Sequence, residues 1–262
     1  MSINLDAIKS KLNQLTGNTP SRGQTFWKPE IGDHVVRLLP FVDNDGQPFK
    51  ERWFYYDIVD GPGILAPVKM GKPDPVSDFA QKLYKDGSSS SKELAKKLRP
   101  KMRAYAPVVV RGQEEKGPRL WAFGTMVYTG LLRLFVDEDY GDITDPQKGF
   151  DVKVSVSQVP GRKWPQTDVK ARPRPSALSD NSEESTKWLE SIPELNDIYT
   201  LKSYEEIKHI LDNWAIGAEN SLNDLGAESN GIVSAATKSV VTAVPVVHQQ
   251  NIDEVFDQLL KN

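Results

Sequence analysis

Side chains that could carry out catalysis are few in this sequence. It contains no cysteine, which excludes thiolate nucleophiles, disulfides and thiolate zinc sites. The histidines, His34, His209 and His248, lack the spacing of a metal-binding pair, and no GxxxxGKS/T loop is present to hold nucleotide phosphates. We therefore expect no catalytic residue, no metal and no cofactor.

The run DEDYGDITD (residues 137–145) is dense enough in carboxylates to hold a divalent cation, as in a metal-dependent DNA-processing enzyme. Its acids do not follow the ligand order of a calcium-binding loop. We favour an exposed acidic loop and keep the enzyme as an alternative.

Cations that recur beside aromatic residues indicate a different chemistry. Single-stranded nucleic acid exposes a charged backbone and flat base faces, and proteins bind it with Lys and Arg next to rings that stack on the bases. In VPGRKWPQTDVKARPRPSAL (residues 159–178), five cations accompany Trp164 and one acid. The candidate nucleic-acid contacts are Lys82, Tyr84, Lys97, Arg99, Lys101, Arg103, Tyr105, Arg119, Trp121, Arg162, Lys163, Trp164, Lys170, Arg172 and Arg174.

Packing in the core competes with base stacking as the role of each aromatic residue. Trp164 is the exception, because it lies between Lys163 and Pro165 in a segment too polar to be core. Segments rich in proline and cations also occur in disordered linkers, which is the alternative for residues 159–178. We favour an irregular loop held by a scaffold, since the segment follows the clearest strand pattern in the chain.

The formal net charge of −3 combines two unlike parts of the chain. Residues 1–178 contain 28 Lys+Arg and 21 Asp+Glu, a net of +7, whereas residues 179–262 contain 5 and 15, a net of −10. This asymmetry favours a polyanion-binding body with an acidic partner segment, and tuning of solubility is the alternative. No apolar run is long enough to span a bilayer and no signal peptide is visible, so we expect a soluble intracellular protein.

The elements that must position these residues are short strands with helices between them. Strand patterns cover residues 34–42, 51–59, 104–111 and 150–159, the last with clean alternation of apolar and polar residues. Helices are expected over 74–86, beginning at Asp74 and Pro75, over 91 to about 98, and from Tyr128 after a strand at 119. The pattern predicts an α+β or small-barrel core.

The two ends of the chain have other characters. Residues 4–15 form an amphipathic helix pattern, and residues 181–192 and 203–216 are acidic helices, the second with Ser203 and Glu206 spaced as a capping box. Residues 216–249 have the composition of a linker. Action through these acidic helices, as a protein-interaction scaffold, is a further alternative function.

The order of several short motifs resembles the single-stranded DNA-binding (helix-destabilising) protein of T-even-type tailed phages. The matching segments are QLTGN (14–18), FWKPEIGDHVVRLLPFVDNDGQPF (26–49), DPVSDFAQKLYK (74–85), YAPVVVR (105–111), FDVKVSVSQVPG (150–161) and PSAL (175–178). They are spread over nearly the whole chain, and their order and spacing carry the resemblance.

The resemblance implies an OB-fold-like small β-barrel core with a helical subdomain, and cooperative, largely sequence-independent coating of single-stranded DNA in phage replication, recombination and repair. It implies an N-terminal segment that contacts the neighbouring protomer, through Leu5, Ile8, Lys9, Lys11 and Leu12. It implies a flexible acidic C-terminal tail that recruits replication and recombination proteins in the cytoplasm of the infected host cell and competes with DNA, through Asp253, Glu254, Phe256, Asp257 and Leu260.

By the same resemblance Tyr105 falls near a DNA-stacking aromatic residue of the family, and residues 162–164 fall where the family has a pair of DNA-contacting aromatic residues. This chain departs from the family there, since Arg162 replaces one ring and Trp164 is displaced by one position. We expect three parts: residues 1–19 as the protomer-contact segment, 20–215 as the DNA-binding core with a helical insertion at about 60–103, and 216–262 as linker and tail.

A second departure concerns zinc, which the family's prototype holds through cysteines and a histidine. Here Asp74 and Ser77 occupy the two positions that flank Pro-Val. We expect no zinc, and a helical subdomain held by apolar packing of Val76, Phe79 and Leu83 instead.

Overall fold

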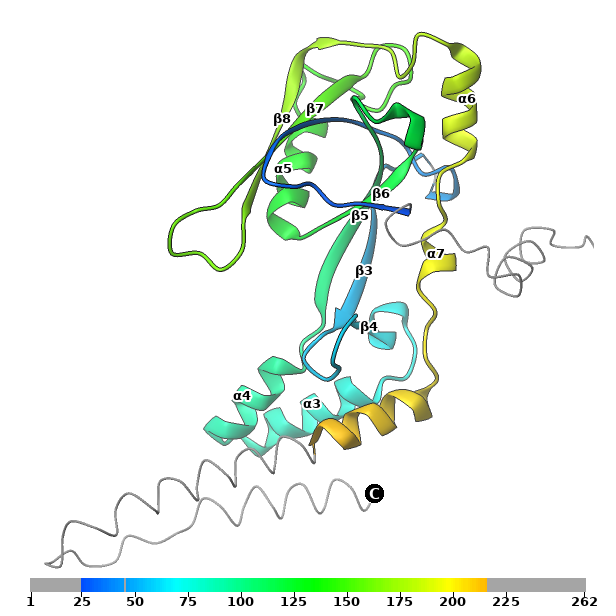
Figure 1. Ribbon diagram of the computed structural model, residues 1–262. Helices are drawn as coiled ribbons and strands as arrows, with labels where there is room; N and C mark the ends of the chain where they lie inside the picture. The colour runs from blue at the N-terminus through cyan, green and yellow to red at the C-terminus, as the bar shows by residue number, and fades with distance from the viewer. Residues whose placement is uncertain (1–24, 45, 216–262) are drawn as a thin grey trace, which may run out of the picture. The chain divides into compact units, whose positions relative to one another are not determined.

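Figure 1 shows the computed structural model of the protein, which describes residues 25–44 and 46–215. The described residues divide into two units. Unit 1 falls within Met1–Arg52 and Met102–Thr200, and unit 2 falls within Trp53–Lys101 and Leu201–Asn262. The N-terminal helix at 4–15, the linker and the C-terminal tail predicted above lie outside the described residues.

The protein is a mixed α+β structure built on an open eight-stranded sheet. Its strands run in the order β1-β6-β5-β2-β7-β8, and β3 pairs with both β5 and β4. The pairs β2–β5, β2–β7, β5–β6 and β7–β8 are antiparallel, and β1–β6 is parallel. The strands are β1 (Phe26–Trp27), β2 (Gly32–Leu38), β3 (Lys50–Tyr55), β4 (Ile64–Leu65), β5 (Lys101–Val110), β6 (Arg119–Phe123), β7 (Phe150–Ser157) and β8 (Gln166–Pro175).

The main core of unit 1 lies on one face of this sheet. Val36, Val108, Trp121 and Val154 come from four different strands and are buried together there. Helix α5 (Thr125–Phe135) contributes its buried Leu131 to the same core.

Helix α5 begins three residues earlier than the sequence predicted. The N–H of Tyr128 donates to the carbonyl of Gly124 at 3.1 Å, which makes the extended Gly124 the N-cap. The predicted start at Tyr128 was wrong because Gly124, which directly follows β6, is the N-cap of the helix.

The opposite face of the sheet is covered over β2 and β5. Leu39 and Val109 pack there against Leu178 and Trp188. Trp188 belongs to α6 (Ser182–Glu190), whose N-cap Asn181 accepts a hydrogen bond from the N–H of Glu183. The short α7 (Leu195–Ile198) follows.

Unit 2 is helical apart from β4 and the end of β3. It contains α3 (Pro75–Asp86), α4 (Ser89–Lys97) and a helix over residues 204–215. Its apolar core includes Val76, Phe79 and Leu83, as the sequence predicted. The predicted capping box is confirmed, since the N–H of Ser203 donates to Glu206 Oε2 at 2.8 Å and the N–H of Glu206 donates to Ser203 Oγ at 3.2 Å.

The start of α3 is organised by the buried carboxylate of Asp74. One of its oxygens accepts from the N–H groups of Val76 and Ser77, and the other accepts from the Tyr55 hydroxyl at 2.8 Å and the N–H of Val68 at 3.1 Å. Burial and this carboxylate raise the pKa of Tyr55 above its ordinary value. Asp74 therefore joins β3, the turn Pro67–Met70 and α3.

Within the described residues, no helix is both long and apolar enough to cross a membrane.

Candidate nucleic-acid interface

The cation-rich segment 159–178 contains a regular strand. Residues 166–175 form β8, which pairs with β7 from Ser157↔Gln166 to Phe150↔Pro175. The interpretation of the whole segment as irregular was therefore wrong. Its prolines are compatible with pairing because β8 is an edge strand of the sheet and needs only one ladder of hydrogen bonds.

Helix α5 supports this hairpin, which we define as β7, the loop 158–165 and β8. A Cβ at Gly130 of α5 would lie 2.8 Å from Cγ2 of Val169, too close for an ordinary contact. The glycine thus allows the helix to pack closely on β8. Figure 1 shows the loop of the hairpin extending beyond the ends of its two strands.

Strand alternation sorts the side chains of the hairpin between two faces. In β8, Thr167, Val169 and Ala171 are half-buried towards α5, and the residues between them are exposed. Lys153 of β7 lies directly opposite Lys170 of β8. We call the face of β2, β7 and β8 that carries Asp33, Lys153 and Lys170 the outer face.

A bulge near the end of β8 presents two further cations. Val152 pairs with Ala171 and Phe150 pairs with Pro175, so three residues of β8 lie opposite the single residue Asp151 of β7. These three residues are exposed, and they are Arg172, Pro173 and Arg174.

The loop of the hairpin is folded into a turn. The N–H of Arg162 donates to the carbonyl of Val159 at 3.1 Å, and Gly161 has φ +78°, as the third residue of a type II turn after Pro160 requires. The side-chain amide of Gln158 also donates to the carbonyl of Arg162, at 2.8 Å.

Trp164, at the end of this loop, exposes a large aromatic surface to solvent. The side chain is 72% exposed, and the Lys163 ammonium lies 5.3 Å from the ring centroid. An exposed ring with an adjacent cation offers both stacking and charge to a nucleotide.

The outer face holds two ion pairs. Lys153 Nζ lies 2.8 Å from Asp33 Oδ2, and Lys170 Nζ lies 3.3 Å from Asp168 Oδ2. The hydroxyl of Ser155 donates to Asp33 at 2.6 Å. The hydrogen bonds from Lys153 and Ser155 lower the pKa of Asp33, so that carboxyl is ionised at neutral pH.

Four cations of the hairpin have no acid within ion-pairing distance among the described residues. We call them the unpaired cations, and they are Arg162, Lys163, Arg172 and Arg174. Two lie in the loop and two in the bulge, at opposite ends of β8.

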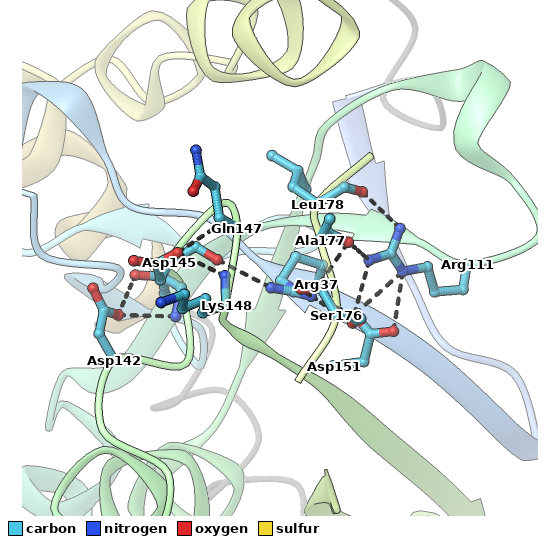
Figure 2. A network of polar contacts seen from close by, with 11 residues as sticks. Arg37, Arg111, Asp142, Asp145, Gln147, Lys148, Asp151, Ser176, Ala177 and Leu178 are labelled. Atoms are coloured by element: carbon cyan, nitrogen blue, oxygen red, sulfur yellow. Dashed lines mark hydrogen bonds and ion pairs between the residues drawn. The ribbon is translucent and has the colours of Figure 1, made fainter. Parts of the chain in front are cut away.

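The base of the hairpin is anchored by a buried arginine network (Figure 2). Arg37 of β2 is fully buried and its Nε donates to Asp151 at 3.0 Å; Arg111 donates to the same carboxylate from Nη2 at 2.9 Å. Because one carboxylate serves two guanidinium groups, backbone carbonyls complete their hydrogen bonds. Those carbonyls belong to Asp145, Ser176, Ala177 and Leu178.

The network fixes the chain that leaves β8. A Cβ at Gly149 would lie 2.5 Å from Arg37 Nη1 and from the Asp145 carbonyl, so only glycine fits beside the buried guanidinium. Burial lowers the pKa of Arg37 from its ordinary value, while the Asp151 carboxylate opposes that shift. These two arginines are engaged inside the fold and are unavailable to a ligand.

Three of the predicted contacts in unit 1 lie inside the fold. Trp121 is 2% exposed and packs against Trp27 and Phe123, with ring centroids 5.3 and 4.7 Å apart. Tyr105 is 2% exposed, and its hydroxyl donates to that of Tyr199 at 3.0 Å. Stacking on a base needs an open ring face. The assignment of Trp121 and Tyr105 to the interface was therefore wrong.

Arg119 is the third buried residue of this set. It is 6% exposed, and its Nη2 donates to the side-chain oxygen of Gln113 at 2.8 Å. Burial lowers its pKa from the ordinary value of an arginine. A cation in this position cannot reach a phosphate, so Arg119 is also removed from the interface. Arg103, the remaining predicted contact of unit 1 outside the hairpin, is exposed.

The remaining predicted contacts belong to unit 2. Lys82 and Lys97 are exposed on α3 and α4. Arg99 donates from Nε to the Tyr84 hydroxyl at 2.8 Å, and Lys101 lies 2.9 Å from Asp57. The predicted set is thus distributed over two units rather than gathered in one.

The acidic run 137–145 is folded into turns by its own carboxylates. Asp137 accepts from the N–H of Asp139, and Asp142 accepts from the N–H and hydroxyl of Thr144. Asp145 accepts from the N–H groups of Gln147 and Lys148, which lower its pKa. Across residues 25–44 and 46–215, no three acidic or histidine side chains are grouped closely enough to hold a metal ion.

Two residues of the outer face, Lys153 and Asp33, were not predicted from the sequence. Lys153 belongs to the alternating strand 150–159, so its exposed position could have been read from the period-two pattern of that strand. Asp33 precedes its strand segment, and only the register Asp33↔Ser155 places it beside Lys153.

No known family matches the chain, and a search of curated proteins found no match either.

Proposed function

We propose that this protein binds single-stranded DNA without catalysis, and that the β7–β8 hairpin is its principal contact. The supporting observation is an exposed Trp164 beside Lys163, on a loop that leads into β8, where two further unpaired cations lie. An exposed ring can stack on a base while cations on either side hold phosphates. Neither feature depends on base identity, so the binding would be largely independent of sequence.

The anchored base of the hairpin supports the same proposal. The arginine network and α5 hold β7 and β8 against the rest of unit 1, so the exposed contacts project from a fixed framework. A prearranged surface loses less conformational entropy when it binds a flexible strand.

The finer assignment rests on the sequence resemblance. We propose that the open sheet is an OB-like fold of the phage single-stranded DNA-binding class, acting in replication, recombination and repair. Cooperative self-association along DNA and recruitment of replication proteins by the C-terminal tail belong to the same proposal.

The test is the affinity of the full chain for a fluorescein-labelled oligothymidylate, measured by fluorescence anisotropy at several salt concentrations. We expect binding that weakens steeply with salt. The double variant Arg172→Gln/Arg174→Gln should bind roughly tenfold or more weakly at low salt, with a salt slope smaller by about 1.4, since each lost phosphate contact removes about 0.7 for single strands.

The matched control is Lys116→Gln/Lys187→Gln, which removes two exposed cations of unit 1 outside the hairpin. This control should leave the salt slope unchanged. Salt-insensitive binding by the unmodified protein, or a preference for duplex, would refute the proposed function.

A further inference from the structure

The outer face has an ordered arrangement of charges. The register places Asp33, Ser155 and Asp168 side by side across β2, β7 and β8, and places Lys153 beside Lys170 in the next row. Each lysine is bound by an aspartate from the other row, at 2.8 Å for Lys153 and 3.3 Å for Lys170. Two lysines and two aspartates therefore neutralise one another in the middle of the hairpin.

The two ends of the hairpin differ from this middle. The loop carries Arg162 and Lys163, and the bulge carries Arg172 and Arg174, all without an acidic partner among the described residues. Arg172 lies six residues along β8 from Gln166, which corresponds to roughly 20 Å along the strand, and Lys163 lies in the loop before Gln166. Positive charge is thus concentrated at two ends that are separated by a neutral stretch.

A contribution to the stability of the fold is a poor explanation for the presence of Asp33 and Asp168 at these positions. Exposed ion pairs contribute little to the stability of a folded protein. Directly opposed lysines such as Lys153 and Lys170 do repel each other, but replacing either with a polar residue would relieve that repulsion without an acid. Within a cationic surface, the two aspartates instead change how many cations are available to a ligand.

We infer that Asp33 and Asp168 set the selectivity of this surface by competing with phosphates for Lys153 and Lys170. The inference rests on the proposed function and deepens it. Phosphates bind the unpaired cations at the two ends, and in the middle the aspartates keep the phosphates of the strand from pairing with the two lysines. A ligand with a higher density of phosphates, such as duplex DNA, loses more from this arrangement than a single strand does.

The expected magnitudes follow from counterion release. Each lysine freed to bind a phosphate adds about 0.7 to the salt slope for a single strand and about 0.9 for a duplex. The variant Asp33→Asn/Asp168→Asn should therefore bind oligothymidylate with a slope larger by about 1.4, and at 0.1 M salt roughly 25-fold more tightly. Its preference for single strand over duplex of equal length should fall by about two- to threefold.

The experiment measures anisotropy with the full chain, using a labelled oligothymidylate and a labelled duplex of the same length. The matched control is Asp180→Asn/Asp197→Asn, which makes the same change in net charge at exposed residues away from the hairpin. A gain for Asp33→Asn/Asp168→Asn above that control supports the inference. Equal gains in the two variants would overturn it, because only net charge would then matter.

A second pair of variants separates competition from a structural effect. Lys153→Gln/Lys170→Gln leaves Asp33 and Asp168 without their cations and should weaken binding, but the salt slope should change little because lysines held by aspartates bind no phosphate. In the Asp33→Asn/Asp168→Asn background the same lysine changes should remove the added slope of about 1.4, which gives a large coupling between the two pairs on the salt slope. Additive effects would overturn the inference.

Failure of the inference is distinguishable from failure of the proposed function. If the unmodified protein binds no single strand, the proposed function is wrong and the inference falls with it. If the unmodified protein binds with a steep salt slope and the asparagine variant matches its control, only the role of Asp33 and Asp168 is wrong.

Discussion

Strand β6 and the loop of the β7–β8 hairpin have similar local sequences and opposite positions in the fold. Each has a tryptophan within two residues of an arginine, Arg119 with Trp121 in β6 and Arg162 with Trp164 in the loop. In β6 the ring is 2% exposed and the arginine 6% exposed. In the loop the ring is 72% exposed and the arginine lies at the surface.

The difference comes from pairing and not from composition. β6 lies between β1 and β5, with Trp121 paired to Trp27 on one side and to Ala106 on the other, so its ring enters the core. The loop residues 158–165 pair with no strand among the described residues. A cation beside an aromatic residue therefore indicates an interface only where the segment lies outside the sheet.

The largest effect expected from this difference between the two tryptophans is on the free energy of unfolding. Trp121→Ala should lower the free energy of unfolding by about 3–5 kcal/mol, because a large ring packed against Trp27 and Phe123 is lost from the core. Urea unfolding followed by circular dichroism measures it. Trp164→Ala is the control and should stay within about 0.5 kcal/mol of the unmodified protein. Similar losses in the two variants would remove the distinction between the regions.

The next effect is on binding. Trp164→Ala should weaken the binding of oligothymidylate by about 1–3 kcal/mol, roughly 5- to 150-fold, through loss of one stacked base. The salt slope should not change, because no phosphate contact is removed. Trp164→Phe keeps a ring and should lose less. Unchanged affinity of Trp164→Ala in anisotropy titrations would place the ring outside the interface.

Local patterns in the sequence predicted the parts of the fold that depend on neighbouring residues. The alternation in residues 150–159 identified β7, and Asp74 with Pro75 identified the start of α3. The spacing of Ser203 and Glu206 identified a capping box. Each of these features is satisfied within about one turn or one strand, so sequence alone was sufficient.

Features that depend on distant partners were not predicted. The prolines of β8 concealed a strand, since their tolerance depends on an edge position that only the strand order reveals. Burial of Arg37 depends on Asp151 and on carbonyls near residue 177, more than 100 positions away. Which cations are exposed, and hence the candidate site, therefore required the register of the sheet.

The smallest effect concerns the two arginines of the compared regions. Arg162→Gln should lower the salt slope for oligothymidylate by about 0.7, and the affinity at 0.1 M salt by about fivefold, through loss of one phosphate contact. Arg119→Gln makes the same chemical change at a buried residue whose Nη2 donates to Gln113, so the slope should stay unchanged. Anisotropy titrations over a range of salt measure both, on variants whose circular dichroism matches the unmodified protein. A reduced slope for Arg119→Gln alone would reverse the assignment and make β6 the binding region, because a salt slope counts phosphate contacts and responds to no change that merely loosens the core.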